Sequence, residues 1–433
     1  MDKILMFIAK FFTFWIINKK LRKKTRKNIY YYLKYPSVRS IEYNIKKNVN
    51  LIKEKTACGQ KIKIAFFVMY DSVFPGINIF EKMRKDDQFE VCIIVIPDIS
   101  RGMENMLYQM EKTYKNLSKK YNNVHFSYDK QKGRFIDFSS KYDMICISNP
   151  YDDMTYKFFT VFYNCKKSLI FYFDYGYIVS NWYLSNLNGH GALKYIYKYF
   201  SIINSKFIRD FEELKNMCFF GYPKMDLLND IVKKKNNRKK IIIAPHHTVS
   251  ISDGICFSNF LNYYNFFLEL PKKYPQIDWV FRPHPLLFIM LEKKEIWTKT
   301  QIKKYLEDIA SNENVEYQEG GDYFETFVNS DAIIHDCGSF MAEYLYVGHP
   351  ACYMLKSDEE NQKNYNDFAR ACIDVHYKAY CENDIIKFIE KVVLFNSDEM
   401  KHHRDDFFQK NIKFEFPYTS DKIIKYLKKE LGI

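Results

Sequence analysis

The sequence contains no apolar run that approaches the roughly 20 residues needed to cross a bilayer. Its ten cysteines form no CxxC pair and no zinc-like cluster. They stand singly in apolar segments such as VCIIVIP and DMICIS, which favours buried, reduced thiols over a disulfide framework or a metal site. A DxD metal motif is absent, and we interpret the pair Asp152 and Asp153 as part of a surface loop. We therefore expect neither a metal nor a cofactor.

The positive charge of the chain is concentrated at its N-terminal end. Of a net charge of +14, residues 1–34 carry +9, with ten Lys or Arg and one Asp. An apolar, aromatic run from Ile4 to Ile17 precedes a basic block from Lys19 to Lys27, and no small-residue cleavage site follows. We expect an interfacial anchor, in which Trp15 and the Phe residues enter the headgroup region and the basic block meets anionic lipid, at about 1 kcal/mol per basic residue.

Two other interpretations of this segment stay open. It could be an ordinary basic helix packed on the protein. Nucleic-acid binding is weaker, because the basic excess is confined to one end and no familiar nucleic-acid module follows it. We therefore expect an anionic membrane surface as a partner and no nucleic acid.

The rest of the chain predicts two α/β domains. Its length, with 47% hydrophobic residues in 433, suits two or three domains. Continuous apolar runs with helical patterns between them are typical of parallel sheets covered on both faces. The runs occupy 63–70, 89–97, 142–150, 168–173, 240–245, 279–285, 315–320, 332–337 and 350–355. The main helical patterns occupy 79–84, 103–117, 257–273, 299–311, 322–330, 339–347 and 383–395.

A charged stretch, VKKKNNRKK at 232–240, separates the two series of strands. We therefore divide the chain into an amphipathic basic segment at 1–35, a first doubly wound domain at 36–231 and a second at 232–433 that includes the C-terminal helices. A cleft between two such domains is expected. In sheets of this kind, ligands bind at the carboxyl ends of the strands.

Three strand ends of the second domain carry polar residues suited to a nucleotide. The segments are IIIAPHHTVS, WVFRPHPLL and AIIHDCGSFMAE. Histidine and arginine there could meet phosphates, a helix starting after a glycine offers free N–H groups to an anion, and a glutamate one turn later could reach a ribose diol. The candidate residues are His246, His247, Arg282, His284, Gly338, Ser339 and Glu343.

Each of these features also has a purely structural interpretation. His246 and His247 could be solvated loop residues, and Arg282 could anchor an ion pair. Gly338 and Ser339 could form an ordinary turn and cap, with the glutamate on a solvent face. The placement of all three groups at strand ends of one domain favours a functional site.

Taken together, these motifs resemble those of the CDP-glycerol glycerophosphotransferase family, whose members include teichoic acid and capsule polymerases with a GT-B arrangement of two Rossmann-like domains. The likeness is carried by RPHP at 282–285, by Ser330-Asp331, and by an acidic residue seven positions after Asp336. GYPKMD at 221–226 is similar to the family's Gly-x-Pro-Arg-Asn-Asp segment. The resemblance covers about 220–355.

The sequence departs from the family pattern at two places. Where the family commonly has Ala-Pro-Thr-Trp-Arg, this chain has APHHT at 244–248, so the arginine is missing. The family's His-Gly-Thr turn, whose histidine is the presumed base, aligns by position with YFDYGYIVS at 172–180. The resemblance then implies Asp174 as the base, because a carboxylate can accept a hydroxyl proton; Asp174 could equally be a structural residue.

The resemblance implies transfer of a glycerol-phosphate or related polyol-phosphate unit from a CDP-linked donor to a hydroxyl of a lipid-linked or growing cell-surface glycan, with release of CMP. The second domain would hold the donor, with His284 and Asp174 in catalytic roles, and the first domain would receive the acceptor. Two alternatives remain: a GT-B glycosyltransferase that uses a nucleotide sugar in capsule or lipopolysaccharide synthesis, and a non-catalytic scaffold. The expected location is the inner face of the cell membrane.

Overall fold

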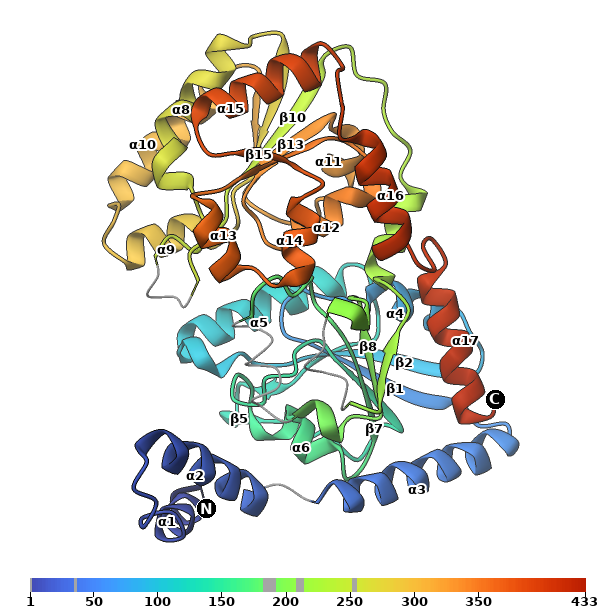
Figure 1. The fold of residues 1–433 in the computed structure, drawn as a ribbon. Coiled ribbons are helices and arrows are strands. Elements are labelled where there is room, and N and C mark those ends of the chain that lie inside the picture. The colour runs from blue at the N-terminus through green and yellow to red at the C-terminus, as the bar shows by residue number, and fades with distance from the viewer. Residues whose placement is uncertain (1, 35–36, 182–191, 208–213, 251–254) are drawn as a thin grey trace.

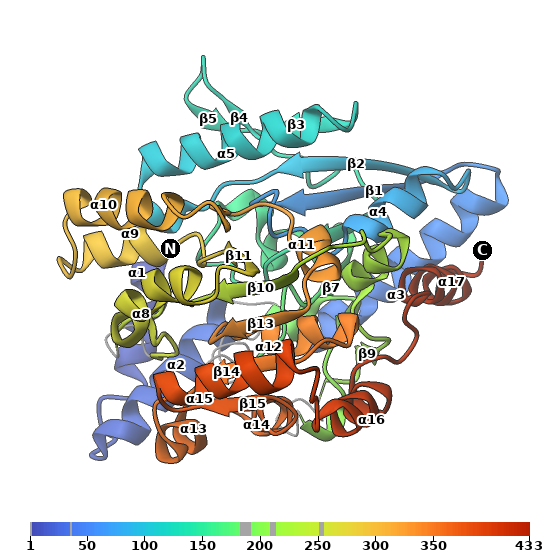
Figure 2. The same ribbon diagram turned by 90° about the horizontal axis from the view of Figure 1, so that it is seen from above.

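The computed structural model describes residues 2–34, 37–181, 192–207, 214–250 and 255–433. Two parallel β-sheets dominate it, one above the other in Figure 1. The first has seven strands in the order β3-β2-β1-β6-β7-β8-β9, and the second has six in the order β12-β11-β10-β13-β14-β15. A two-stranded antiparallel hairpin, β4-β5, projects from the first domain (Figure 2).

The strands of the first domain are β1 (Ile62–Val68), β2 (Phe89–Val95), β3 (Val124–Phe126), β4 (Tyr128–Asp129), β5 (Arg134–Phe135), β6 (Met144–Ile147), β7 (Leu169–Phe173), β8 (Lys198–Ser201) and β9 (Met217–Phe219). The strands of the second domain are β10 (Lys239–Ala244), β11 (Ile277–Phe281), β12 (Val315–Tyr317), β13 (Ala332–His335), β14 (Ala351–Met354) and β15 (Tyr377–Ala379).

The α-helices up to the second sheet are α1 (Asp2–Phe11), α2 (Lys19–Lys34), α3 (Val38–Ala57), α4 (Ile77–Arg84), α5 (Met103–Ser118) and α6 (Val161–Asn164). Those that follow are α8 (Phe260–Lys273), α9 (Leu287–Lys293), α10 (Lys299–Ala310), α11 (Phe324–Asn329), α12 (Phe340–Glu343), α13 (Asp358–Asn364), α14 (Asp367–Ile373), α15 (Glu382–Lys387), α16 (Lys401–Asn411) and α17 (Thr419–Leu431). The 3₁₀ helices η6 (Pro223–Asp230) and η8 (Tyr344–Val347) also matter below.

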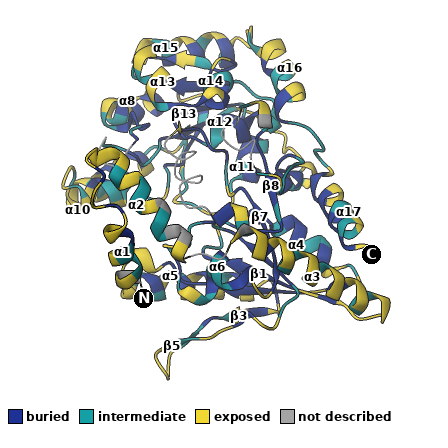
Figure 3. Ribbon diagram, turned by 60° about the horizontal axis from the view of Figure 1, so that its bottom comes forward, coloured by how far each residue is buried: buried dark blue, intermediate teal, exposed yellow. Residues whose placement is uncertain are grey.

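Four of the inner strands are buried along their whole length. Every residue of β6, β7, β13 and β14 is buried, and Figure 3 shows both sheets enclosed by helices with exposed outer surfaces. A parallel strand covered on both faces needs apolar side chains at every position, which explains the continuous apolar runs in the sequence. The predicted fold class, two doubly wound Rossmann-like domains, is confirmed.

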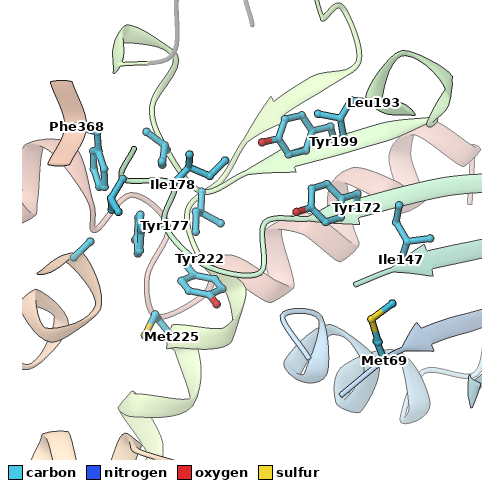
Figure 4. Close-up of a cluster of buried hydrophobic side chains, with 14 of the residues drawn as sticks. Met69, Ile147, Tyr172, Tyr177, Ile178, Leu193, Tyr199, Tyr222, Met225 and Phe368 are labelled. Carbon is cyan, nitrogen blue, oxygen red and sulfur yellow. The ribbon is translucent and has the colours of Figure 1, made fainter. Parts of the chain in front are cut away.

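One apolar core cluster continues from the first domain into the second. It contains Tyr172 and Tyr199 of the first sheet, and Phe257 and Phe368 of the second domain. Figure 4 shows part of this cluster, with Tyr177 next to Phe368; the two rings stack with centroids 5.3 Å apart. The edges of the two domains that face each other are therefore joined by packed side chains.

The first two helices form a hairpin on one flank of the molecule. Helix α1 packs against α2, and the Nε of Arg26 donates a hydrogen bond of 3.2 Å to Thr13 Oγ1 across the hairpin. Its aromatic residues point outward: Phe7, Phe14 and Trp15 are 68–70% exposed. Within the described ranges, no helix is long and apolar enough to span a membrane.

The last helix, α17, returns to the first domain. Ile423, Leu427 and Leu431 belong to the same core cluster as strands β1 and β2, and Asp226 accepts hydrogen bonds from the backbone N–H groups of Thr419 and Ser420 at 3.2 and 2.7 Å. By its contacts, α17 completes the first domain, although it follows the second in the chain.

Candidate functional site

The three polar strand ends lie side by side in the structure. Strands β11, β10 and β13 are neighbours in the second sheet and run parallel. Their carboxyl ends therefore meet at one edge, where His246, Arg282 and Gly338 follow the three strands. The backbone N–H of His284 donates to Pro245 O at 2.9 Å, which ties two of these loops together.

Three histidines converge at this edge. The ring centroids of His246 and His247 are 4.2 Å apart, those of His247 and His284 are 4.0 Å apart, and those of His246 and His284 are 5.3 Å apart. One nitrogen of each ring lies within 4.8 Å of the others, so the group is close enough to hold a divalent metal ion. We call these three residues the histidine cluster.

Hydrogen bonds to the rings indicate which nitrogens carry protons. The Nδ1 of His284 accepts the backbone N–H of Leu286 at 3.1 Å, so in a neutral ring the proton is on Nε2. The Nδ1 of His246 contacts Thr248 Oγ1 at 2.8 Å and accepts the Thr248 N–H at 3.3 Å. A metal would need a bare nitrogen at each ligand, whereas Nε2–H groups suit a phosphate oxygen. The contacts therefore favour an oxyanion.

His246 of the histidine cluster is poorly suited to carry a positive charge. Burial, followed by the charges of His247 and His284, holds the pKa of His246 well below its ordinary value. The imidazole of His246 is therefore neutral at pH 7, and it acts as a hydrogen-bond donor rather than as a cation.

Asp336, which sequence reasoning did not single out as a site residue, holds the loop of the histidine cluster. Its Oδ1 accepts the backbone N–H of His246 at 2.6 Å, and its Oδ2 accepts that of Asn259 at 2.5 Å. Burial raises the pKa of Asp336 to about 7. The aspartate of the HDCGS stretch thus connects β13 to the loop after β10, and its position at the strand end was the available signal.

Arg282 has a different environment from the one expected of a phosphate ligand. The side chain is 6% exposed, and its guanidinium donates to Gln318 Oε1 at 2.7 Å and to Gly321 O at 2.6 Å. It also lies 5.8 Å from the centre of the Tyr323 ring. In this structure Arg282 braces the loop after β12, with two of its five N–H groups engaged there.

Glu343 is buried and already held by two hydroxyl groups. Only 3% of the residue is exposed. Its Oε1 accepts from Ser339 Oγ at 2.8 Å, and its Oε2 accepts a short hydrogen bond from the Tyr323 hydroxyl. The alternative of a solvent-facing glutamate is therefore wrong, and the ribose-binding role stays a prediction. Tyr323 was missed because it precedes Glu343 by 20 residues, in a loop without a motif.

The helix that follows Gly338 is shorter than predicted. The pattern over 339–347 predicted one helix capped by Ser339, but α12 covers only Phe340–Glu343 and continues as the 3₁₀ helix η8. Ser339 has helical φ and ψ of −66° and −32° and makes no side-chain cap. Its hydroxyl is instead engaged with Glu343 and with the backbone N–H of Tyr177, at 2.8 Å. Gly348 ends η8 with φ 71°, as expected.

A loop of the first domain covers this helix start. Residues 176–179 follow β7, and a Cβ placed on Gly338 would lie 2.8 Å from Val179 Cγ2. Asn366 of the second domain donates its Nδ2 to Ile178 O at 2.8 Å and its backbone N–H to Val179 O at 3.0 Å. Gly338 is therefore needed here for close approach of this loop, which we call the β7 loop.

Asp174, the expected base, lies behind the β7 loop. It is 1% exposed, and its two carboxylate oxygens accept from the Tyr199 hydroxyl at 2.8 Å and the Ile202 N–H at 3.1 Å. Burial raises its pKa to about 7. Both of its oxygens are engaged inside the first domain, so this geometry supports a structural role, and a base role stays a prediction.

Replacement of Asp174 by Asn is expected to change how stability depends on pH. The pKa is about 7 in the folded protein and about 3.9 in an unfolded chain. Between these values the folded state binds the extra proton, so Asp174 stabilises increasingly as pH falls from about 7 towards 4, by up to about 1.4 kcal/mol per pH unit. Urea unfolding of wild type and Asp174→Asn at pH 5 and pH 8 measures the difference. A pH-independent difference would contradict the assigned pKa, and a large loss of turnover in the folded variant would restore the base role.

Comparison with known proteins gives a fold and no family. The sequence matches no family model and no curated protein. Among solved structures, it is similar to the wall teichoic acid polymerase TagF, with a TM-score of 0.56 and 13% identity over 90% of this chain and 98% of that one. It is also similar to the UDP-GlcNAc 2-epimerase from Neisseria meningitidis bound to UDP-GlcNAc, with a TM-score of 0.52 and 13% identity over 86% of this chain and 100% of the other.

The fold is GT-B. A third neighbour, the S. aureus MnaA structure with UDP, agrees with a TM-score of 0.53 at 13% identity, over 86% of this chain and 97% of the other. In this GT-B fold the histidine cluster, the Glu343 network and the β7 loop lie where the second domain meets the first. At these identities the likeness extends to the fold alone, so activity has to be argued from the residues.

Proposed function

We propose that this GT-B protein transfers a polyol-phosphate unit, such as glycerol phosphate, from a CDP-linked donor to a hydroxyl of a lipid-linked or growing cell-surface glycan. The observation that carries the proposal is the histidine cluster, whose imidazole rings gather at the carboxyl edge of the second sheet. The motif order around it resembles that of glycerophosphotransferases, and TagF shares the fold. A cluster of imidazole hydrogen-bond donors suits an anion that enters and leaves at each turnover.

In the proposed reaction, the acceptor hydroxyl attacks the phosphorus that bears the polyol. The bond from this phosphorus to the oxygen it shares with the CMP phosphate breaks, CMP leaves with that electron pair, and the hydroxyl proton passes to a base or to solvent. The histidine cluster would donate to phosphate oxygens, with His284 nearest the charge that develops in the transition state. Catalysis would come mainly from such positioned donors.

Glu343 would hold the ribose diol of the nucleotide, exchanging its hydrogen bonds to Ser339 and Tyr323 for bonds to the sugar. Because the β7 loop contacts Gly338 and Ser339, we expect donor phosphates beside these residues only when this loop has moved away. Arg282 would act through the loop it braces, so its contribution to the donor site is indirect.

A nucleotide-sugar glycosyltransferase is the second candidate, since one neighbour, a UDP-GlcNAc 2-epimerase, was solved with UDP-GlcNAc, and another, MnaA, with UDP. Incubation of the full chain with a glycan acceptor and CDP-glycerol, CDP-ribitol, UDP-sugars or CMP-sugars, followed by mass spectrometry of the acceptor, separates the two. A mass increase of one polyol phosphate with release of CMP supports the proposal. Addition of a bare sugar with release of UDP contradicts it, and no turnover of any donor favours a scaffold.

We further propose that the α1–α2 hairpin holds the protein on an anionic membrane, at the cytoplasmic face. Its outward aromatic residues and exposed basic side chains suit lipid headgroups. In Figure 1 the hairpin lies beyond the first domain, at the end of the molecule away from the second sheet.

Deletion of residues 1–34 is expected to abolish flotation with vesicles that contain phosphatidylglycerol, while the two domains stay folded. Wild-type binding should weaken at high salt, because screening shortens the reach of the basic residues. Two triple variants, each with three Lys→Gln substitutions, distinguish an effect of the hairpin's own charge from an effect of the protein's net charge. The test triple is Lys19, Lys20 and Lys23, and the control triple on α17 is Lys422, Lys425 and Lys429. Flotation of the truncated protein, or equal loss in both triples, would contradict this role.

A further inference from the structure

Lys224 is a cation of the chain segment that joins the two domains. It lies on η6, between the last strand of the first sheet and the first strand of the second. Its side chain is partly buried, with Nζ 3.4 Å from the Tyr323 hydroxyl oxygen. The ammonium also lies 4.9 Å and 5.3 Å from the ring centres of Tyr323 and Phe324. Lys224 thus reaches from the segment that joins the two domains into the second domain.

Tyr323 links this ammonium to the carboxylate proposed to bind ribose. The hydroxyl that Lys224 approaches donates to Glu343, and Glu343 is in turn bonded to Ser339. The other nearby cation, Arg282, donates to Gln318 and Gly321. Arg282 could turn towards a ligand only by giving up the hydrogen bonds that hold the loop after β12. Within the described residues, Lys224 holds no loop in this way, and its flexible side chain can turn towards a ligand.

Lys224 lacks a direct ion pair with any carboxylate of the described residues. Burial lowers its pKa, while the more distant charges of Glu343 and Asp322 act in the opposite direction. A partly buried ammonium without a close counter-ion is unfavourable, and an anion brought next to it restores the balance. If this side chain only filled space between the rings of Tyr323 and Phe324, an apolar residue would serve equally well.

We propose that Lys224 binds a phosphate of the nucleotide donor, from the chain segment that joins the two domains. The assignment rests on the proposed function, because Glu343 is there taken to hold the ribose. In a nucleotide bound with its diol at Glu343, the 5′-phosphate lies across the sugar ring from the diol, and the flexible stem of Lys224 would carry its ammonium from Tyr323 towards that phosphate. A lysine is suited to this task as a compact charge with three N–H donors. Helix η6, which joins the two domains, thereby contributes a residue to a site otherwise built by the second domain.

Titration calorimetry on the full chain with CDP, UDP, cytidine and uridine tests the assignment. Lys224→Met and Lys224→Gln are expected to weaken binding of the preferred diphosphate by about 10- to 100-fold, and to change binding of its nucleoside less than about twofold. Lys224→Arg should retain much of the affinity, since it keeps the charge. Lys425→Met, at an exposed lysine of α17, is the matched control, and circular dichroism checks folding.

The outcomes distinguish the assignment from the function on which it rests. Equal losses of affinity for the diphosphate and the nucleoside would show that Lys224 only supports the structure. Unchanged affinity for the diphosphate in a folded Lys224→Met or Lys224→Gln protein would also overturn the assignment. Neither result would contradict the proposed function. Wild-type protein that binds none of the four compounds would overturn the proposed function and, with it, this role of Lys224.

Discussion

Replacement of His284 by alanine is expected to lower turnover by about 10²–10³-fold, the usual effect of removing one positioned donor from a site of developing negative charge. His284 offers an Nε2–H group because its Nδ1 accepts the Leu286 N–H. Donor affinity should fall less than turnover, because the bond to charge strengthens in the transition state. Initial rates of CMP release from CDP-glycerol, at saturating and limiting donor, measure both.

Two further variants sharpen this test. His284→Gln can place an amide N–H near the position of Nε2 and should recover part of the lost rate. His403→Ala, at an exposed histidine of α16, should leave the rate unchanged. A folded His284→Ala protein with normal turnover would remove the histidine cluster from the mechanism.

Replacement of Glu343 by alanine is expected to weaken nucleotide binding by about 1–3 kcal/mol, roughly 5- to 150-fold, because a ribose diol is left without its acceptor. The loss should appear for nucleosides and nucleotides alike, which separates this role from that of Lys224. Calorimetry with cytidine and CDP measures it. The variant also leaves the hydroxyls of Ser339 and Tyr323 without their shared acceptor, so some loss of stability is expected as well.

A variant that keeps an acceptor oxygen distinguishes binding from stability. Glu343→Gln can still accept from one hydroxyl, and should fold with near-normal stability while binding ribose more weakly. Glu325→Ala, at an exposed glutamate of α11, serves as the control. Normal cytidine and CDP affinity in folded Glu343→Gln and Glu343→Ala would contradict the proposed ribose site.

The inner strands of both sheets could be predicted from the sequence because they are largely buried on both faces, whereas β3, β8, β9 and β15, at or next to the sheet edges, were not predicted. Each apolar run between 63 and 173, and between 240 and 355, corresponds to a strand to within a few residues. The meeting of the polar strand ends followed from parallel topology alone. The hydrogen-bond partners of the site residues could not be predicted, because they lie far away in the sequence. Arg282 donates to Gln318, and Ser339 accepts from the backbone N–H of Tyr177 in the other domain.

Two further features had no local signal. The stretch after Ser339 has a helical pattern over 339–347, yet it tightens to 3₁₀ geometry after Glu343, where its side chains pack under tertiary constraint. Lys224 stood in the quoted GYPKMD segment, but its spacing from Tyr323 can be seen only in three dimensions. Propensity and periodicity describe neighbours along the chain, and these contacts join segments about 100 residues apart.

The return of α17 to the first domain has a consequence for how the protein emerges from the ribosome. Asn78 of α4 donates to Ser420 Oγ at 2.8 Å across a separation of 342 residues. Translation delivers a domain's residues in order, and domains ordinarily fold as they appear. Here the apolar surface of the first sheet that α17 covers stays uncovered until the final helix has been synthesised. We therefore expect the nascent first domain to expose this apolar surface, and to be prone to aggregation, while the second domain is synthesised.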